Sequence, residues 1–440
     1  MSATRLRSIS FWLSAVRRLS LVAIVCLSAA AQQPKTEHLF DFGGKAPPGY
    51  IEVAANQLYS EARGYGFEPG STTEGITRGS NNPYDDGFVT SSKPFFFSVA
   101  VPEGNYRVTA TLGDRDGTSV TTVKAELRRL MVEKAETAAG MLTRVSFVVN
   151  VRRPEISGGA RVKFKPRETT SEAWAWDDKL TLEFSNKEPK LCALSITKVD
   201  VPTVYIAGDS TSTDQALEPY NSWGQMLTAF FKPDVAIANN GESGETARSF
   251  IGENRWAKVM SVIKPGDWIL IQFGHNDQKE KGEGVGAFTT YKATLKRFIT
   301  DASEHGAKPV LITSMNRRTF DAEGKAMNSL GDFPEAVRQL AHEENVPLID
   351  LNAMSKTLYE ALGSEGSGKL FAGSDTTHHS DYGSYELAKC VVSGIQQNHL
   401  ALAKYLKGDL PKFDPAHPDP FDKFDIPPDP NFTAIKPYGQ

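Results

Sequence analysis

The sequence contains few cysteines and no cluster of residues with the spacing of a metal site. Only three of its 440 residues are cysteine, and only Cys192 and Cys390 lie beyond the N-terminal segment. Two cysteines do not form a disulfide framework, so we expect two buried thiols, although export would permit a disulfide bond. No group of cysteines and histidines has the spacing that zinc requires, so the sequence predicts no metal site.

The sequence also lacks an excess of positive charge and has few long apolar segments. The formal net charge is −4 at pH 7, which argues against attraction to nucleic acid or to an anionic membrane. Beyond the N-terminal segment, no apolar stretch reaches the ~20 residues that a membrane-spanning helix needs. With 40% hydrophobic and 23% charged residues, the composition is that of a soluble globular protein, and its length suits two domains. The sequence specifies no oligomeric state.

The N-terminal segment has the pattern of a secretory signal peptide. Arginines precede a short apolar run, Leu19–Leu27, and small residues follow it up to Ala31. This order of a positive flank, an apolar core and small residues predicts a signal peptide over residues 1–31, with cleavage after Ala31. The alternative is an uncleaved N-terminal anchor. We therefore expect a secreted or periplasmic protein with no membrane association after removal of the signal.

Residues 37–200 have the pattern of an all-β domain. Apolar and polar residues alternate in segments near 106–112, 145–149 and 179–184. Turn sequences such as Pro102-Glu-Gly-Asn105 separate the segments. Period-two alternation between turns is typical of half-buried antiparallel strands, and several of them in ~160 residues predict a β-sandwich.

Residues 202–405 have the pattern of an α/β domain. Four nearly continuous apolar runs predict buried parallel strands: 203–207, 268–273, 309–313 and 346–350. Apolar stripes at helical spacing lie between or after them, near residues 291–299, 333–341 and 387–395. Asp332 and Glu335 have the spacing of a capping box for the second of these helices. Alternating strands and helices predict a doubly wound fold. Residues 406–440, rich in Pro, Asp and Phe, predict an extended tail that is either loose or lies across the domains.

Two polar clusters follow or lie near strands of this predicted sheet, where open α/β sheets place their sites. Gly208-Asp-Ser-Thr211 directly follows the first strand, so Ser210 is a candidate nucleophile or, alternatively, a plain helix-capping serine. Asn239-Asn-Gly-Glu-Ser-Gly244 is glycine-rich, which permits a backbone amide to approach a ligand or simply makes a turn. Neither cluster is specific by itself.

Two further segments supply amide and imidazole groups. After the second strand, Asn276 has an amide that can donate to an oxyanion, or it is a turn residue, and His275 is more readily explained as structural. Asp375 precedes His378 by three residues, so its carboxylate can accept the imidazole Nδ1–H, as in an acyl-transfer site. The alternative is a capping aspartate beside a surface histidine. His379 is an adjacent competitor that physical reasoning from the sequence does not separate from His378.

Together these segments resemble, in order and context, the four conserved blocks of the SGNH (GDSL) hydrolases. The resemblance covers about residues 201–401 and implies a three-layer α/β/α, flavodoxin-like fold with five parallel strands. It assigns Ser210 as nucleophile, His378 as base and Asp375 as the acid of the triad. The oxyanion hole then consists of the backbone amides of Ser210 and Gly244 with the Asn276 side chain. Such an enzyme needs no cofactor.

Within that superfamily the sequence is most similar to rhamnogalacturonan acetylesterases. The similarity rests on Tyr205–Thr211, Ser222-Trp-Gly224, Ala247-Arg-Ser-Phe250 and Ile271–Asp277. The second block departs from the usual Asn-x-Ala-x-x-Gly-Arg-Ser, because Glu245 and Thr246 replace the Arg and Ser. The change at 245 bears on substrate preference and not on catalysis. His379 also stands where an aromatic or small residue is usual.

The N-terminal domain contains four short motifs: Phe40-Asp-Phe-Gly43, Tyr65-Gly-Phe67, Arg128-Arg-Leu130 and Trp176-Asp-Asp-Lys179. In these motifs it resembles the galactose-binding-like β-sandwich that precedes many bacterial members. Trp174 and Trp176 could stack on sugar rings there, or they could pack in the core. The resemblances imply a secreted carbohydrate esterase that removes acetyl groups from an acetylated plant cell-wall polysaccharide or oligosaccharide, foremost rhamnogalacturonan. The alternatives are an acetylxylan esterase, another GDSL esterase or lipase, and a non-catalytic carbohydrate-binding protein.

Overall fold

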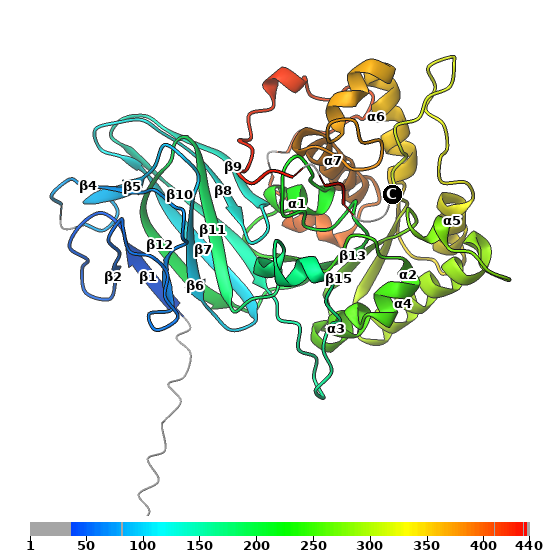
Figure 1. Cartoon of the computed structure of the whole chain (residues 1–440), viewed down its shortest axis with the longest axis horizontal. Helices are drawn as coiled ribbons and strands as arrows, with labels where there is room; N and C mark the ends of the chain where they lie inside the picture. Colours follow the sequence, from blue (N-terminus) through cyan, green and yellow to red (C-terminus); the bar gives the residue numbers. More distant parts are fainter. Residues whose placement is uncertain (1–36, 81, 409, 434, 438–440) are drawn as a thin grey trace, which may run out of the picture. The chain divides into compact units, whose positions relative to one another are not determined.

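The N-terminal part of the chain is a β-sandwich. The computed structural model describes residues 37–437 other than 81, 409 and 434, so the expected signal peptide lies outside the described residues. One sheet has the order β10-β7-β12-β1-β2, with β5 and β4 attached through β12, and the other has the order β3-β6-β11-β8-β9 (Figure 1). The strands are β1 Glu37–Asp41, β2 Ile51–Glu52, β3 Tyr65–Phe67, β4 Glu74–Thr77, β5 Gly87–Thr90, β6 Phe95–Ala100, β7 Gly104–Asp114, β8 Ser119–Ala125, β9 Arg129–Thr137, β10 Met141–Val151, β11 Lys179–Glu188 and β12 Lys190–Val199.

Apolar residues from both sheets form the core of the sandwich. The alternating segments near 106–112, 145–149 and 179–184 lie in β7, β10 and β11, as expected. Phe40 of β1 meets Phe97 of β6 edge to face, with ring centroids 5.2 Å apart. Phe97 in turn packs on Phe67 at 5.3 Å, so aromatic rings join the two sheets. The predicted β-sandwich is confirmed.

The C-terminal part is built on a five-stranded parallel sheet with the order β14-β13-β15-β16-β17. The four apolar runs form four of its strands, although the last is only two residues long. The fifth strand, β14, is the short sequence Ala-Ile-Ala-Asn, which gives too weak a pattern to be found from the sequence. The strands are β13 Thr203–Gly208, β14 Ala236–Asn239, β15 Trp268–Gln272, β16 Lys308–Ile312 and β17 Leu348–Ile349.

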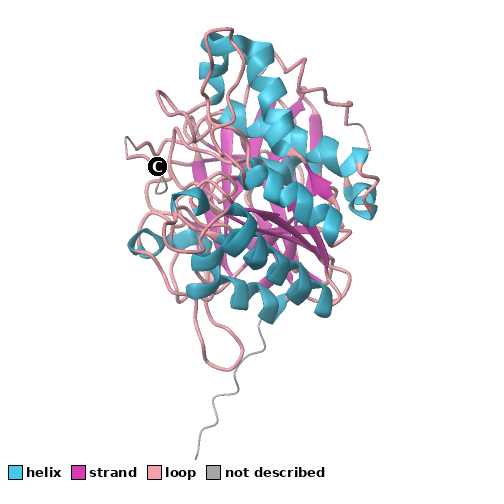
Figure 2. Ribbon diagram, turned by 90° about the vertical axis from the view of Figure 1, so that its right-hand side faces the viewer, coloured by secondary structure: helices cyan, strands magenta, loops and turns pink. Residues whose placement is uncertain are grey.

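Helices cover both faces of this sheet, which confirms the three-layer α/β/α fold (Figure 2). Successive strand residues point to opposite faces: Ile206 and Leu270 pack among residues of α1, α6 and α7, whereas Ala207 and Ile269 pack among residues of α2, α3, α4 and α5. The helices are α1 Trp223–Leu227, α2 Ala247–Gly252, α3 Arg255–Val262, α4 Lys292–Glu304, α5 Phe333–Glu343, α6 Leu351–Gly366 and α7 Asp381–Gln397.

The predicted capping box at the start of α5 is wrong. Asp332 has α-helical backbone angles (φ −83°, ψ −4°), and its side chain accepts no capping hydrogen bond. An N-cap side chain reaches the free amides of the first turn from an extended backbone, and Asp332 does not have that conformation. Pro334, within the first two residues of α5, fits the helix start instead.

The C-terminal tail lies across both parts of the chain, the second of the two expected arrangements. Its Asp419 carbonyl accepts a hydrogen bond from the Tyr382 hydroxyl at 2.6 Å, on the α/β domain. Its Pro427 carbonyl accepts one from Lys124 Nζ at 2.9 Å, on the β-sandwich. Both Cys192 and Cys390 are free and buried, as predicted. No helix among the described residues combines the length and apolar character needed to span a membrane.

Candidate active site

Ser210 lies in a tight turn directly after β13. A Cβ atom on Gly208 would come within 2.6 Å of the Gln272 carbonyl, so the backbones of β13 and β15 approach each other too closely for another residue. Asp209 then accepts hydrogen bonds from the Thr211 amide at 3.0 Å and hydroxyl at 2.7 Å, which fixes the turn. The Gly-Asp-Ser-Thr sequence therefore has a local structural reason, and the turn holds Ser210 at the carboxyl end of the sheet.

The structure brings Ser210, His378 and Asp375 into one hydrogen-bonded chain. His378 Nε2 lies 2.9 Å from Ser210 Oγ, and its Nδ1 lies 3.0 Å from Asp375 Oδ2. Because the aspartate accepts the Nδ1–H, Nε2 is left as the acceptor for the serine hydroxyl. All three side chains are buried. The three-residue offset between Asp375 and His378 works because both lie in the loop just before α7.

The surroundings of Asp375 favour its ionised form. Burial alone would raise its pKa, but hydrogen bonds from the His378 side chain and from backbone amides outweigh burial and lower the pKa to about 2. The backbone donors are Thr377 N at 2.7 Å and His378 N at 3.1 Å, both to Oδ1. The carboxylate therefore keeps its charge and its orientation at any pH near neutrality.

The two competing histidines have other partners. His379 Nε2 is hydrogen-bonded to the Tyr359 hydroxyl at 2.8 Å, and its ring packs on Phe371 at 4.4 Å. Burial, and then the neighbouring His378, lower its pKa to about 3, so it is neutral at physiological pH. His275 is buried with its Nδ1 3.6 Å from Asp209 Oδ2, and burial lowers its pKa as well. Neither ring lies in the chain that contains Ser210.

The predicted oxyanion donors lie on the two loops that flank the serine turn. Gly244 has φ +83°, a backbone conformation that favours glycine. Asn276 Nδ2 donates to the Glu245 carbonyl at 3.0 Å, and its second N–H remains for another acceptor. Gln215 Nε2 joins the loops, because it donates to the Ser210 carbonyl at 2.7 Å and to Ser243 Oγ at 3.3 Å.

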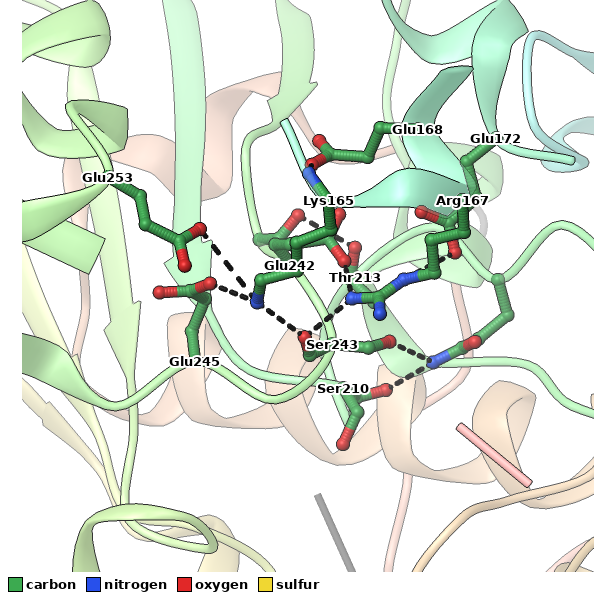
Figure 3. A network of polar contacts seen from close by, with 12 residues as sticks. Lys165, Arg167, Glu168, Glu172, Ser210, Thr213, Glu242, Ser243, Glu245 and Glu253 are labelled. Atoms are coloured by element: carbon green, nitrogen blue, oxygen red, sulfur yellow. Dashed lines mark hydrogen bonds and ion pairs between the residues drawn. The ribbon is translucent and has the colours of Figure 1, made fainter. Parts of the chain in front are cut away.

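Glu245 lies in a buried network of charges beside the same loop (Figure 3). It forms an ion pair with Lys165 and accepts a hydrogen bond from Ser249 Oγ at 2.5 Å. Arg167 pairs with Glu242 on the other side of the loop. Burial raises the pKa of Glu245 to about 7, although Lys165 opposes the increase. Sequence reasoning missed Lys165 and Arg167, since they lie more than 70 residues from their partners.

A cavity of about 650 Å³ opens beside this loop. Gly244 and Tyr220 line it together with the 165–172 segment and residues 433 and 435–437 of the tail. The Tyr220 ring, which lines the cavity, also meets the His378 ring edge to face at 6.0 Å. Charged ends of Lys165, Arg167 and Glu172 mix there with the apolar faces of neighbouring residues.

The two tryptophans of the sandwich pack against other side chains and are not arranged as a platform for sugar rings. Trp176 is buried with its Nε1 donating to Glu168 at 2.8 Å, and the Arg152 guanidinium lies over its ring at 4.3 Å. Trp174 packs on Phe96 at 5.5 Å. These contacts correspond to the core-packing alternative. Among the described residues, no group of three or more His, Cys, Asp or Glu side chains could hold a metal ion.

Comparison with known proteins identifies both parts of the chain. Residues 206–384 match the GDSL-like Lipase/Acylhydrolase family, and residues 38–137 match the Beta-agarase/YXIM esterase-like, galactose-binding domain-like family. A rhamnogalacturonan acetylesterase of Bacillus subtilis is 39% identical over 218 residues, which are 46% of this chain and 93% of that protein.

Two further matches extend over most of the chain. An uncharacterized esterase of Bacillus subtilis is 28% identical over 409 residues, covering 89% of this chain and 99% of that protein. The crystal structure of the protein YXIM from Bacillus subtilis has 26% identity and a TM-score of 0.45, covering 83% of this chain and 99% of that one. The family match, together with the level of identity to a relative that is covered almost completely, shows that this chain belongs to the GDSL-like lipase/acylhydrolase family and is a carboxylic ester hydrolase.

Proposed function

We propose that the protein is an acetylesterase that removes acetyl groups from rhamnogalacturonan with Ser210, His378 and Asp375 as its catalytic triad. The observation that carries the proposal is the hydrogen-bonded chain from Asp375 through His378 to Ser210, with distances of 3.0 and 2.9 Å. This order of acid, base and nucleophile is the arrangement that acyl transfer to a serine requires. The relative at 39% identity carries the name rhamnogalacturonan acetylesterase, which supports the substrate.

The geometry suits a two-step mechanism through an acetyl-enzyme. Ser210 Oγ attacks the acetyl carbonyl while His378 Nε2 takes its proton, and Asp375 stabilises the imidazolium that forms. The amides of Ser210 and Gly244 and the Asn276 side chain donate to the oxyanion. His378 then protonates the departing sugar oxygen. In the second step it activates water, which releases acetate and restores Ser210.

The lining of the cavity beside Gly244 supports a carbohydrate substrate. A sugar ring has apolar faces and a rim of hydroxyl groups, and the lining offers both kinds of partner. Tyr220 and Leu217 contribute apolar surface to the lining, and Lys165, Arg167 and Glu172 contribute charged groups. A long acyl chain would find charges along its path, which disfavours a lipase.

Acetate release from defined polymers tests the proposal. Acetylated rhamnogalacturonan, acetylated xylan and a deacetylated control are incubated with the enzyme and with Ser210→Ala. We expect acetate chiefly from rhamnogalacturonan and, for the variant, a loss of at least about a thousandfold in kcat. Near wild-type turnover by Ser210→Ala would overturn the serine mechanism. Preferential release from xylan would instead overturn the substrate and leave the mechanism standing.

We further propose that the protein acts outside the cytoplasm, as a secreted or periplasmic enzyme. The support is the order of arginines, apolar run and small residues within the first 31 positions of the sequence. N-terminal sequencing of the exported protein is expected to begin just after Ala31. Full-length protein retained in the cytoplasm of the producing cell would contradict the assignment.

A further inference from the structure

Two cations from the β-sandwich bind one carbonyl of the loop beside Ser210. Lys165 Nζ donates to the Ser243 carbonyl at 2.8 Å, and Arg167 Nη2 donates to the same oxygen at 2.6 Å. Figure 3 shows both side chains converging on Ser243. Lys165 and Arg167 lie in the segment that connects β10 with β11, so a domain distant in sequence reaches the catalytic loop.

The Ser243 carbonyl belongs to the same peptide group as the Gly244 amide. In a trans peptide the C=O and the N–H point in opposite directions, and the group is planar. Cations that hold the carbonyl on one side therefore fix the direction of the Gly244 N–H on the other. Gly244 has φ +83° and no side chain of its own to restrict this peptide, so the restraint has to come from its neighbours.

Carboxylates on the loop hold the two cations in place. Glu242 pairs with Arg167 and Glu245 pairs with Lys165, so an ion pair stands on each side of Ser243. Arg255 adds a third cation 3.6 Å from Glu245. A carbonyl that accepts hydrogen bonds from two charged donors is strongly polarised, and its own amide becomes a stronger donor. The arrangement thus fixes and strengthens the group that would bind the oxyanion.

We propose that Lys165 and Arg167 are positioning residues of the esterase, which hold the Ser243–Gly244 peptide in the orientation that lets its N–H bind the oxyanion. The inference rests on the proposed function, because it takes the Gly244 amide as an oxyanion donor. On this basis the β-sandwich contributes to turnover through the 165–167 segment and is not only an attached binding module.

Steady-state kinetics of Lys165→Met and Arg167→Met test the proposal. Methionine keeps much of the aliphatic volume and removes the charged donor. Loss of a whole oxyanion donor costs about 100- to 1,000-fold in kcat, so we expect a loss of about 10- to 100-fold from a misoriented one. With a small soluble acetyl ester, which does not fill the cavity, KM should change by less than about threefold. Lys165→Arg and Arg167→Lys retain a charged donor and should recover most of the lost kcat.

Lys163 provides a matched control on the same segment. Its Nζ also donates to a carbonyl of the α/β domain, that of Gly252, at 2.8 Å. Lys163→Met should therefore keep the wild-type kcat. An equal loss of kcat in Lys163→Met would show that any loosening of the segment suffices, and it would overturn the proposal. An effect of Lys165→Met and Arg167→Met confined to KM would overturn it as well, because it would indicate substrate contact.

Two additions keep the test decisive. Lys165→Met removes the Lys165–Glu245 ion pair and leaves Arg255, 3.6 Å away, as the remaining cation at Glu245. The double variant Lys165→Met with Glu245→Gln therefore removes both charges of the lost pair. It should fold as stably as the wild type and still show the reduced kcat. Ser210→Ala separates the two proposals: if it is inactive while Lys165→Met and Arg167→Met turn over normally, only the positioning role is refuted. If Ser210→Ala is active, the proposed function itself fails.

Discussion

Arg128 offers the sharpest test of how the β-sandwich is held to the α/β domain. The side chain is 4% exposed and forms ion pairs with Glu218 and, at 3.1 Å, with Asp381. Its other terminal nitrogen donates to the Tyr220 carbonyl at 2.8 Å and to the Gln215 carbonyl at 3.3 Å. Replacement by methionine keeps the aliphatic part and removes every one of these donors.

The expected loss follows from what Arg128→Met leaves behind. Removing one partner of a buried ion pair costs about 3–5 kcal/mol, since the remaining charge stays buried without compensation. Here two carboxylates remain. Burial, and then the charge of Asp381, already raise the pKa of Glu218 to about 7, and Arg128 opposes this increase. Without Arg128 the folded-state pKa rises further above the unfolded value of 4.5.

This pKa change gives the destabilisation a pH dependence of known sign. A carboxyl whose folded-state pKa is raised stabilises the fold below its unfolded pKa and loses that contribution as the pH rises through the folded value. In the wild type the loss ends near pH 7, whereas in Arg128→Met it continues above pH 7. The gap in unfolding free energy between the two proteins should therefore be wider at pH 8.5 than at pH 6.

Urea denaturation followed by tryptophan fluorescence measures the gap at both pH values. Arg107→Met is the matched control, because Arg107 also joins the sandwich to the α/β domain, through the Pro233 carbonyl at 3.0 Å, but its side chain is 41% exposed. Because this contact is exposed, we expect Arg107→Met to lower the unfolding free energy by less than about 1 kcal/mol. A loss of that small size for Arg128→Met at pH 8.5, or a gap that does not widen with pH, would refute the reasoning.

The buried carboxyl groups of Asp375 and Asp277 give further predictions. Asp375→Asn should lower kcat about 10,000-fold because asparagine no longer selects the Nδ1–H tautomer of the base; a loss below about tenfold would contradict the triad. The folded-state pKa of Asp375 is lowered from 3.8 to about 2, so its ionised form should contribute about 2 kcal/mol to the unfolding free energy at pH 7. This contribution should be lost as the pH falls from about 4 to 2, which acid titration of the unfolding free energy measures. For Asp277, burial raises the pKa to about 8, so wild-type stability should fall relative to Asp277→Asn by up to about 1.4 kcal/mol per pH unit between pH 4 and 8. Melting temperatures of the two proteins that stay parallel over this range would argue against a neutral Asp277.

Sequence patterns located the elements that bury continuous apolar runs. The strands at 203–208 and 268–272 were predictable because each of their residues is buried against neighbouring strands and two helix layers. β14 was not, because Ala236–Asn239 contains a single large apolar residue. Its place in the sheet comes from pairing with β13, a contact between segments that local periodicity does not describe.

The choice between adjacent histidines shows a second limit. His378 and His379 are adjacent in the sequence, so the residues around them do not indicate which of the two is the base. In the structure, His379 is hydrogen-bonded to Tyr359 and packs on Phe371. His378 instead lies between Asp375 and Ser210 and is hydrogen-bonded to both. Tyr359 comes from α6, an element the sequence did not reveal. Only the resemblance of the whole block to a family could separate the two residues before the structure was known.

Glu245 shows why a loop has to be judged with its surroundings. In the sequence, Glu245 replaces the usual Arg, which reverses the charge at this position of the loop that carries Gly244. In the structure, Lys165 of the β-sandwich supplies a cation at Glu245, and Arg167 supplies another at Glu242. The cation at the loop thus comes from the sandwich, and Glu245 binds the same Lys165 ammonium group that donates to the Ser243 carbonyl.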